Sequence, residues 1–156
     1  MDATTPLGLK AIESSRIAID RLETQTPYTF ARFADDLPAI CDGIILNGDN
    51  PIALYEVKSR AMSSVELFDR FDGEWLVSYE KIHGIYNVTK ALCLSFVGVL
   101  YCTKDDVVLA TTVWDKTGSM RIRLRIEQTE TRKTVNGGTI SRANAFLDMT
   151  TATRYT

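Results

Sequence analysis

The sequence contains few of the residues that build zinc sites or disulfide frameworks. Among 156 residues there are three cysteines and a single histidine, His83. The cysteines Cys41, Cys93 and Cys102 are odd in number and show no C-x-x-C spacing, so neither a zinc site nor a set of disulfides is indicated. His83 has no partner at metal-ligand spacing, and we expect it to be a packed helix residue. We expect a reducing, intracellular compartment, the cytoplasm, because thiols stay free there.

Long apolar runs are also missing. No stretch approaches the roughly 18 consecutive apolar residues of a membrane-spanning helix. The N-terminal sequence MDATTPLGLKAIESS lacks the basic start and apolar core of a signal peptide. We therefore expect no association with a membrane. With 45% hydrophobic and 24% charged residues, the composition is that of a globular protein, and the length predicts one domain over residues 1–156.

The chain lacks an excess of positive charge. Its net charge is −2 and its pI is about 5.4, which argues against a protein that coats nucleic acid through bulk attraction. The distribution is less even, because residues 121–156 carry seven Lys and Arg against three Asp and Glu. This basic part is either a local phosphate-binding surface or a solvated tail, and composition leaves both open.

The most informative stretch runs from Ala39 to Arg60 and reads AICDGIILNGDNPIALYEVKSR. Two apolar runs, Ile40–Leu46 and Ile52–Val57, flank the turn sequence Asn47–Asn50. Short apolar runs around an Asn-Gly turn are typical of a β-hairpin. We therefore predict two paired strands here.

Three charged residues interrupt this apolar hairpin. Asp42 lies in the first predicted strand, and Glu56 and Lys58 lie in the second. Side chains alternate across a strand, so Glu56 and Lys58 share a face and Val57 points the other way. Buried charges are costly unless they neutralise one another or bind a metal. These three residues are therefore candidates for a functional site.

The constellation Asp42…Glu56-Val57-Lys58 resembles the signature of the PD-(D/E)XK nuclease superfamily, and small, single-domain, phage-type members in particular. In that family an Asp on one strand and an (Asp/Glu)-X-Lys on the next assemble a divalent-metal site. The sequence has Cys41 where the family's name has Pro, a departure that leaves the metal-binding residues intact.

The preceding loop also contains Asp35 and Asp36, which are rivals to Asp42 for the first position of the motif. We prefer Asp42 because it lies inside an apolar run, whereas solvated acids are common in turn-like sequence.

The resemblance implies a catalytic site that binds Mg²⁺ or Mn²⁺. Asp42, Glu56 and the backbone carbonyl of Val57 would be the metal ligands. Lys58 would act on the attacking water and counter the negative charge of the transition state. Glu13, on the first predicted helix, would bind the metal through water, and an exposed helix residue is the alternative for it.

The predicted order of elements adds to the resemblance. We expect a helix from Pro6 to about Glu23, strands at Tyr28–Phe33, Ile40–Leu46 and Ile52–Val57, a short helical piece at Val65–Phe71, a helix from about Trp75 to Leu92, and strands at Leu94–Cys102 and Val107–Trp114. This order matches the αβββαβ core of the restriction-endonuclease-like fold over about residues 8–115. The predicted fold class is thus α/β, with a mixed central β-sheet flanked by helices.

Lys81 lies on the second long predicted helix. In many small members of the superfamily a Lys or Gln on this helix supports the active site, and Lys81 matches that position. A surface lysine with its stem against the core is an equally good interpretation.

The segment Met120–Ile126, MRIRLRI, shows the clearest alternation in the chain. It places Arg121, Arg123 and Arg125 on one face of a strand. Three arginines in this arrangement either follow a nucleic-acid phosphate backbone or protect an edge strand from aggregation.

The remaining residues predict a C-terminal β-hairpin extension over about residues 119–156. A Thr-rich stretch, Gln128–Arg142, surrounds Asn136-Gly137-Gly138 and predicts a second hairpin. The end of the chain, Ala143–Thr156, is weakly patterned, and we expect it to be partly disordered.

The function that these features predict is metal-dependent hydrolysis of DNA phosphodiester bonds, with DNA as the partner. A homodimer is a further expectation, because one domain carries one site and a duplex has two strands. The alternative is a catalytically inactive nuclease-fold protein that binds nucleic acid or a protein partner. A third hypothesis is an unrelated α/β domain in which Glu56 and Lys58 form a structural ion pair.

Overall fold

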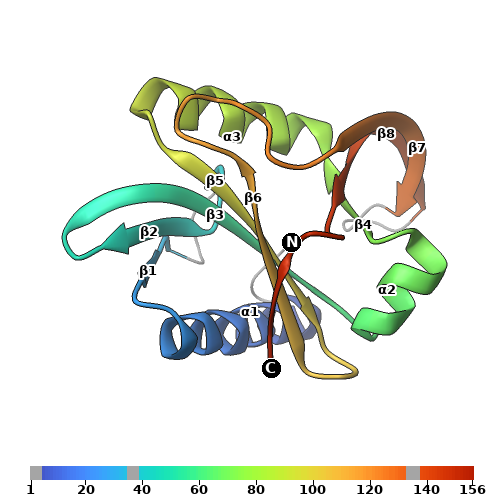
Figure 1. Cartoon of the computed structure of the whole chain (residues 1–156). Helices are drawn as coiled ribbons and strands as arrows, with labels where there is room; N and C mark the ends of the chain where they lie inside the picture. The colour runs from blue at the N-terminus through green and yellow to red at the C-terminus, as the bar shows by residue number, and fades with distance from the viewer. Residues whose placement is uncertain (1–4, 35–38, 133–137) are drawn as a thin grey trace.

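The structure is a computed structural model that describes residues 5–34, 39–132 and 138–156 (Figure 1). Its helices are α1 (Pro6–Gln25), α2 (Ser64–Phe71) and α3 (Tyr79–Leu92). Its strands are β1 (Thr29–Arg32), β2 (Gly43–Asn47), β3 (Asn50–Arg60), β4 (Glu74–Ser78), β5 (Ser95–Cys102), β6 (Val107–Trp114), β7 (Leu124–Arg132), β8 (Thr139–Asp148) and β9 (Thr153–Tyr155). No helix in the described ranges is long and apolar enough to cross a membrane.

The larger sheet has six strands in the order β1-β2-β3-β5-β6-β9. Strands β1, β2 and β3 form an antiparallel meander, whereas β3 and β5 are parallel. A parallel neighbour requires a crossover connection, and here α2, β4 and α3 lie between β3 and β5 in the chain. The predicted hairpin and the mixed sheet flanked by helices are confirmed.

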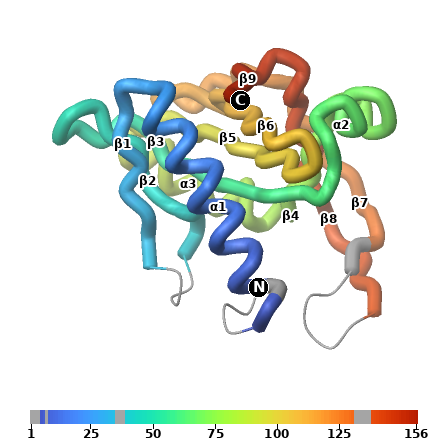
Figure 2. Tube along the Cα trace, turned by 90° about the horizontal axis from the view of Figure 1, so that it is seen from below, coloured from blue at the N-terminus to red at the C-terminus, as the bar shows by residue number. Residues whose placement is uncertain are grey.

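The two faces of this sheet bury different side chains because residues alternate along each strand. On β3, Tyr55 and Val57 join an apolar cluster with α1, and Leu54 joins a second cluster on the opposite face. That second cluster also contains Ile82 and Ile85 of α3 and buried residues of β4 and β8. Figure 2 shows α1 in front of the strands and α3 behind them. Glu56, between Tyr55 and Val57, therefore faces α3.

The helix ends follow local sequence signals. Thr5 accepts a hydrogen bond from the Gly8 amide at the start of α1, and Pro6 occupies the first helical position. Ser63 and Glu66 form a reciprocal capping box at the start of α2. Asp72 and Gly73 both have positive φ and end this helix, so the chain reverses directly into β4.

A smaller sheet, in the order β4-β8-β7, corrects one prediction. The helix expected from about Trp75 begins only at Tyr79, because Glu74–Ser78 is strand β4. Trp75 and Val77 are buried while their neighbours are half-buried. This period of two is the pattern of a strand. A short apolar run is compatible with a helix or a strand, and here its pairing with β8 makes it a strand.

The C-terminal region is more ordered than the sequence predicts. β7 and β8 form the expected second hairpin, although residues 133–137, with Asn136 and Gly137 of its turn, lie outside the described residues. The expectation of partial disorder beyond Ala143 is wrong, because Ala145, Leu147 and Met149 are fully buried and β9 pairs with β6.

Candidate functional site

The site is built on the half of β3 that extends beyond its hairpin partner. The pairing of β2 with β3 ends at Gly43 and Tyr55. From Glu56 to Arg60, the only described strand that pairs with β3 is β5. This part of the strand presents Glu56, Lys58 and Arg60 on one face, two residues apart. Its edge toward β2 is open to other groups.

Glu56 is the most buried charge of the site. Its side chain has no exposed surface, whereas those of Lys58 and Lys81 are 35% and 26% exposed. One carboxylate oxygen, Oε1, contacts both ammonium groups, and the Lys81 Nζ donates to it at 2.6 Å. The second oxygen, Oε2, is buried and accepts no hydrogen bond from the residues described. Glu56 is thus only half satisfied, although two cations surround it.

The electrostatics of this cluster follow from burial and close charge. Burial raises the pKa of Glu56, and the neighbouring Asp42 carboxylate raises it further, while Lys58 and Lys81 oppose the shift. For Lys58, burial acts to lower the pKa, but the Glu56 and Asp42 carboxylates together outweigh it and leave the pKa raised. Lys58 is therefore an ammonium ion at neutral pH.

Asp42 lies directly before β2 and not within it, which corrects its predicted place in the first strand. Its amide donates to the Tyr55 carbonyl at 3.0 Å, and its carbonyl accepts from the Phe33 amide at 3.0 Å. Its Oδ2 accepts the Val57 N–H at 2.7 Å. The carboxylate thus replaces a ladder partner at the open edge of β3.

The orientation of Val57 follows from this hydrogen bond. The N–H and C=O of one strand residue point to the same edge. Because the Val57 N–H points to Asp42, its carbonyl faces the same side of β3. The site therefore combines the Asp42 carboxylate, a backbone carbonyl and the buried Glu56.

Glu13, the other predicted acidic ligand, is not brought to this cluster. Glu13 is exposed on α1, the helix that covers the sheet face opposite to the Glu56 side chain. The rival acids Asp35 and Asp36 lie outside the described residues. In the described part of the chain, no three Asp, Glu, His or Cys side chains gather closely enough to hold a metal. The candidate site therefore has two carboxylates.

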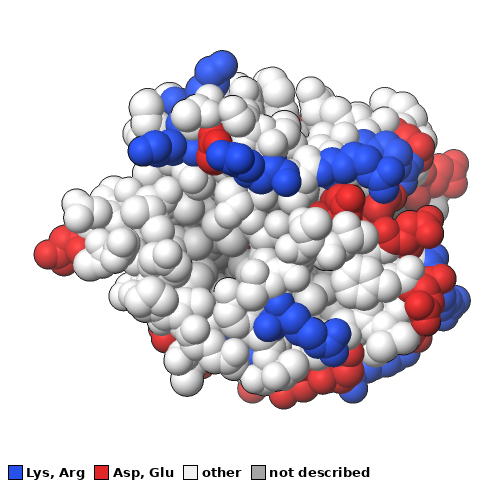
Figure 3. All heavy atoms as spheres, in the orientation of Figure 1, with Lys and Arg blue, Asp and Glu red and all other residues white. Residues whose placement is uncertain are grey.

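The three predicted phosphate-binding arginines each contact a carboxylate of the protein. Arg121 lies 2.6 Å from Asp115, and Arg123 lies 3.4 Å from Glu74. Arg125 contacts Glu74 at 2.5 Å and also pairs with Glu127. Figure 3 shows acidic and basic atoms side by side at the end of the molecule formed by β7 and β8.

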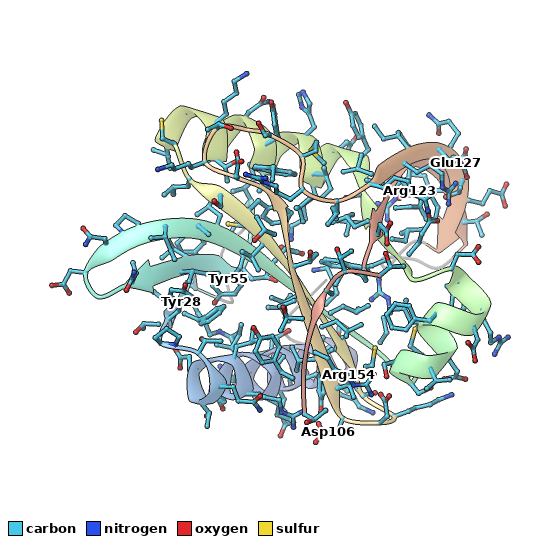
Figure 4. The ribbon with its side chains drawn as sticks, viewed as in Figure 1. Tyr28, Tyr55, Asp106, Arg123, Glu127 and Arg154 are labelled. Carbon is cyan, nitrogen blue, oxygen red and sulfur yellow. The ribbon has the colours of Figure 1, made fainter. Side chains whose placement is uncertain are left out.

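Only Arg125 of the three arginines lies in a regular strand, because β7 begins at Leu124. β7 is an edge strand of the smaller sheet. This geometry favours the edge-protection alternative, and binding of phosphate by these arginines stays a prediction. In Figure 4, Arg123 and Glu127 lie well apart from Tyr55 of β3.

The cysteines and the histidine take no part in the cluster of charges. Cys41 and Cys102 are buried free thiols, and burial raises the pKa of each to about 11. Cys93 is an exposed free thiol. His83 lies on α3 with its ring 5.8 Å from that of Tyr79, but it is exposed, so the expectation of a packed residue is wrong.

Sequence reasoning missed two residues beside the site, Arg60 and Trp75. Both line a pocket of roughly 360 Å³ between α2 and the smaller sheet. Alternate residues of a strand share a face, so the pattern that places Glu56 and Lys58 together also places Arg60 on that face. The sequence therefore contained a signal for Arg60. Trp75 had no such signal, because its position depends on the pairing of β4 with β8.

Comparisons of this chain with protein-family models, with curated proteins and with solved structures found no match. The arrangement around β3 is therefore the basis for assigning a function.

Proposed function

We propose that this protein is a metal-dependent nuclease that hydrolyses DNA phosphodiester bonds at the site formed by Asp42, Glu56 and Lys58. The observation that carries the proposal is the half-satisfied Glu56 carboxylate. One oxygen is held by two lysines, and the other is buried with no hydrogen-bond partner among the described residues. A buried oxygen without a partner is costly, and a hard cation would satisfy it.

The donor set fits Mg²⁺ or Mn²⁺. Mg²⁺ prefers oxygen ligands and is commonly held by one or two carboxylates together with water and substrate phosphate. Glu56 Oε2, the Asp42 carboxylate and the Val57 carbonyl would hold it. Such a cation, when bound, polarises a phosphoryl oxygen and lowers the pKa of a bound water.

The lysines of the site have different roles in this proposal. Lys58 is charged at neutral pH and a third exposed, so it acts as a hydrogen-bond donor to the attacking water and as a counter-charge in the transition state. Lys81 contacts the same oxygen of Glu56 from α3. It therefore orients the carboxylate and leaves Oε2 as the free oxygen.

The topology supports a restriction-endonuclease-like core. The chain supplies a helix, three antiparallel strands, a helix and a strand parallel to the third, as α1, β1–β3, α3 and β5. This is the αβββαβ order that the resemblance implies. In this proposal α2 and β4 are an insertion before the second core helix, and β7 and β8 extend it into a second sheet.

A second candidate function is a catalytically inactive protein of this fold that binds nucleic acid or a protein partner. The observation that favours it is the pairing of Glu56 with two lysines, which neutralises the carboxylate without a cation. A cluster whose charges neutralise one another in this way can persist in a protein that catalyses no reaction.

Cleavage assays separate the two functions. Labelled single-stranded, duplex and branched DNA would be incubated with the wild type and with Glu56→Gln in Mg²⁺, Mn²⁺ or EDTA. We expect cleavage of at least one form with metal only, and loss of cleavage in the variant while DNA binding survives. If the wild type cleaves none of the forms in either metal but binds DNA, the second candidate is correct.

Size-exclusion chromatography of the wild type with and without duplex DNA tests the proposed homodimer. Cutting both strands requires two sites or two visits, because the described part of each chain contains one such cluster. A monomer that still cuts both strands would support two visits.

A further inference from the structure

Arg60 is a partly buried cation that has no acidic partner in the described structure. The only hydrogen bond of its guanidinium among the described residues is from Nη1 to the carbonyl of Ser59, at 3.1 Å. None of the ion pairs in the described residues includes it, although a guanidinium has five N–H donors. Burial alone lowers its pKa, with no carboxylate to offset the effect. The other pocket-lining arginine, Arg125, is paired with Glu74. Arg60 therefore lacks an anion.

Arg60 lines the pocket of roughly 360 Å³, whose walls are mostly apolar and aromatic. Its lining includes Leu100 of β5, Phe71 of α2, and Trp75 and Phe146 of the smaller sheet. Phe71 is the most exposed of these rings, and the Arg125 guanidinium lies over the Phe146 ring. The size lies within the range of small-molecule sites. Aromatic walls beside a free guanidinium are the combination on which a nucleobase stacks while its phosphate is bound.

The pocket adjoins the proposed catalytic residues along the same strand. Arg60 follows Lys58 by two residues on one face of β3, a separation of about 6.6 Å. Leu100 is the register partner of Lys58 on β5. A DNA strand with its scissile phosphate at Lys58 would therefore bring its next nucleotide to Arg60. Two acids, Asp72 and Glu74, also line the pocket, and Glu74 is neutralised by Arg125.

We propose that Arg60 and this pocket bind the nucleotide next to the scissile phosphodiester, with the guanidinium on its phosphate and the base inside the pocket. The inference rests on the proposed function, because it takes Lys58 to mark the reacting phosphate. A base enters such a pocket only when it is unstacked and unpaired. The preferred substrate is therefore single-stranded DNA or an unpaired end, and continuous duplex is disfavoured.

Binding of single-stranded oligonucleotides in EDTA, where cleavage does not occur, tests the inference. The probes contain 2-aminopurine at successive positions, because its fluorescence reports changes in stacking. We expect Arg60→Gln to weaken binding about tenfold or more, as for loss of one charge-assisted contact. The slope of log affinity against log salt should become shallower by about 0.7, as for one phosphate.

Two further variants make the test specific. Arg16→Gln is the matched control, because Arg16 is an exposed arginine of α1, the helix on the opposite face of the sheet, and it should leave affinity and salt slope unchanged. Met62→Trp fills the pocket from its wall. It should abolish the 2-aminopurine response at the position that the pocket binds, with the salt slope retained.

The outcomes separate this inference from the proposed function. Arg60-dependent binding of single strands by a protein that cleaves no DNA would overturn the nuclease and leave the nucleotide site in place. Metal-dependent cleavage with identical binding by Arg60→Gln, Arg16→Gln and wild type would overturn the nucleotide site alone. A 2-aminopurine response that persists in Met62→Trp would also overturn it.

Discussion

Two groups of basic residues in this protein follow the same alternating pattern but lie in different surroundings. Lys58 and Arg60 project from the open half of a central strand, beside a buried carboxylate. Arg123 and Arg125 lie at or near the start of an edge strand and contact acids of the protein. The period of two is identical, so it does not distinguish a site from a solvated face. The two regions differ instead in whether each charged group has a partner of opposite charge within the protein.

This difference has a physical basis. Arg121, Arg123 and Arg125 each contact a carboxylate near water, so nothing remains for a ligand to satisfy, and such exposed pairs contribute little to stability. On β3, Glu56 has one oxygen without a hydrogen bond and Arg60 has no counter-ion in the described structure. Unsatisfied buried groups are costly, and they persist most readily where a ligand completes them.

The largest expected effect is on catalysis by Lys58. Lys58→Met keeps the apolar stem and removes the charge, and we expect the cleavage rate to fall by about 10²- to 10⁴-fold. Lys104→Met is the matched control, because Lys104 is 55% exposed and paired with Glu66. If Lys58→Met cleaves at the wild-type rate, the charges of β3 have no role in catalysis, as we expect for the arginines of residues 121–125.

Lys81 should have a smaller effect, because it acts through Glu56. We expect Lys81→Met to lower the cleavage rate by about 10- to 100-fold, as for residues that orient a metal ligand, and to raise the metal concentration for half-maximal activity. Lys90→Met, in the last turn of the same helix, is the control. Loss of activity that no metal concentration restores would contradict this role.

The pH dependence of stability should reveal Glu56. Its pKa in the folded protein is raised above the ordinary value of 4.5, so between the two pKa values the folded state binds more protons than the unfolded state. The free energy of unfolding of the wild type therefore falls with rising pH in this interval, relative to Glu56→Gln, by up to about 1.4 kcal/mol per pH unit. Urea unfolding in EDTA at pH 4 to 8 measures the difference. Parallel curves would contradict the raised pKa.

The arginines of residues 121–125 should have the smallest effect on DNA. Since all three pair with acids of the protein, replacing Arg121, Arg123 and Arg125 together by Gln should leave the DNA affinity and its salt slope nearly unchanged. If they do bind phosphates, the slope becomes shallower by up to three contacts. That result would restore this strand as a DNA-binding surface.

The sequence predicted those features that depend on local pattern. The hairpin of β2 and β3 and the shared face of Glu56 and Lys58 follow from the alternation of side chains along a strand. The contact of Lys81 with this pair was implied only by the resemblance, with a surface lysine as an equal alternative. The Asn-Gly turn fixed the first of these features within a few residues.

Features set by long-range pairing were not predictable in this way. Trp75 belongs to a strand only because β8, some 70 residues later, pairs with β4. The partners of the arginines, Asp115 and Glu74 among them, come from other parts of the chain. Asp42 lies outside its strand because its carboxylate takes the place of a ladder partner at Val57. None of these contacts has a signature in the local sequence.

The stability of Glu56→Gln with and without metal tests the central claim most directly. In EDTA the variant should be no less stable than the wild type, because it removes a buried charge and leaves two partly exposed ammonium groups that can turn to water. Millimolar Mg²⁺ or Mn²⁺ should raise the Tm of the wild type in proportion to occupancy and leave the variant unchanged. A loss of roughly 3–5 kcal/mol in the variant, with no effect of metal on the wild type, would show that Glu56 and its lysines are a structural ion cluster and would contradict the nuclease assignment.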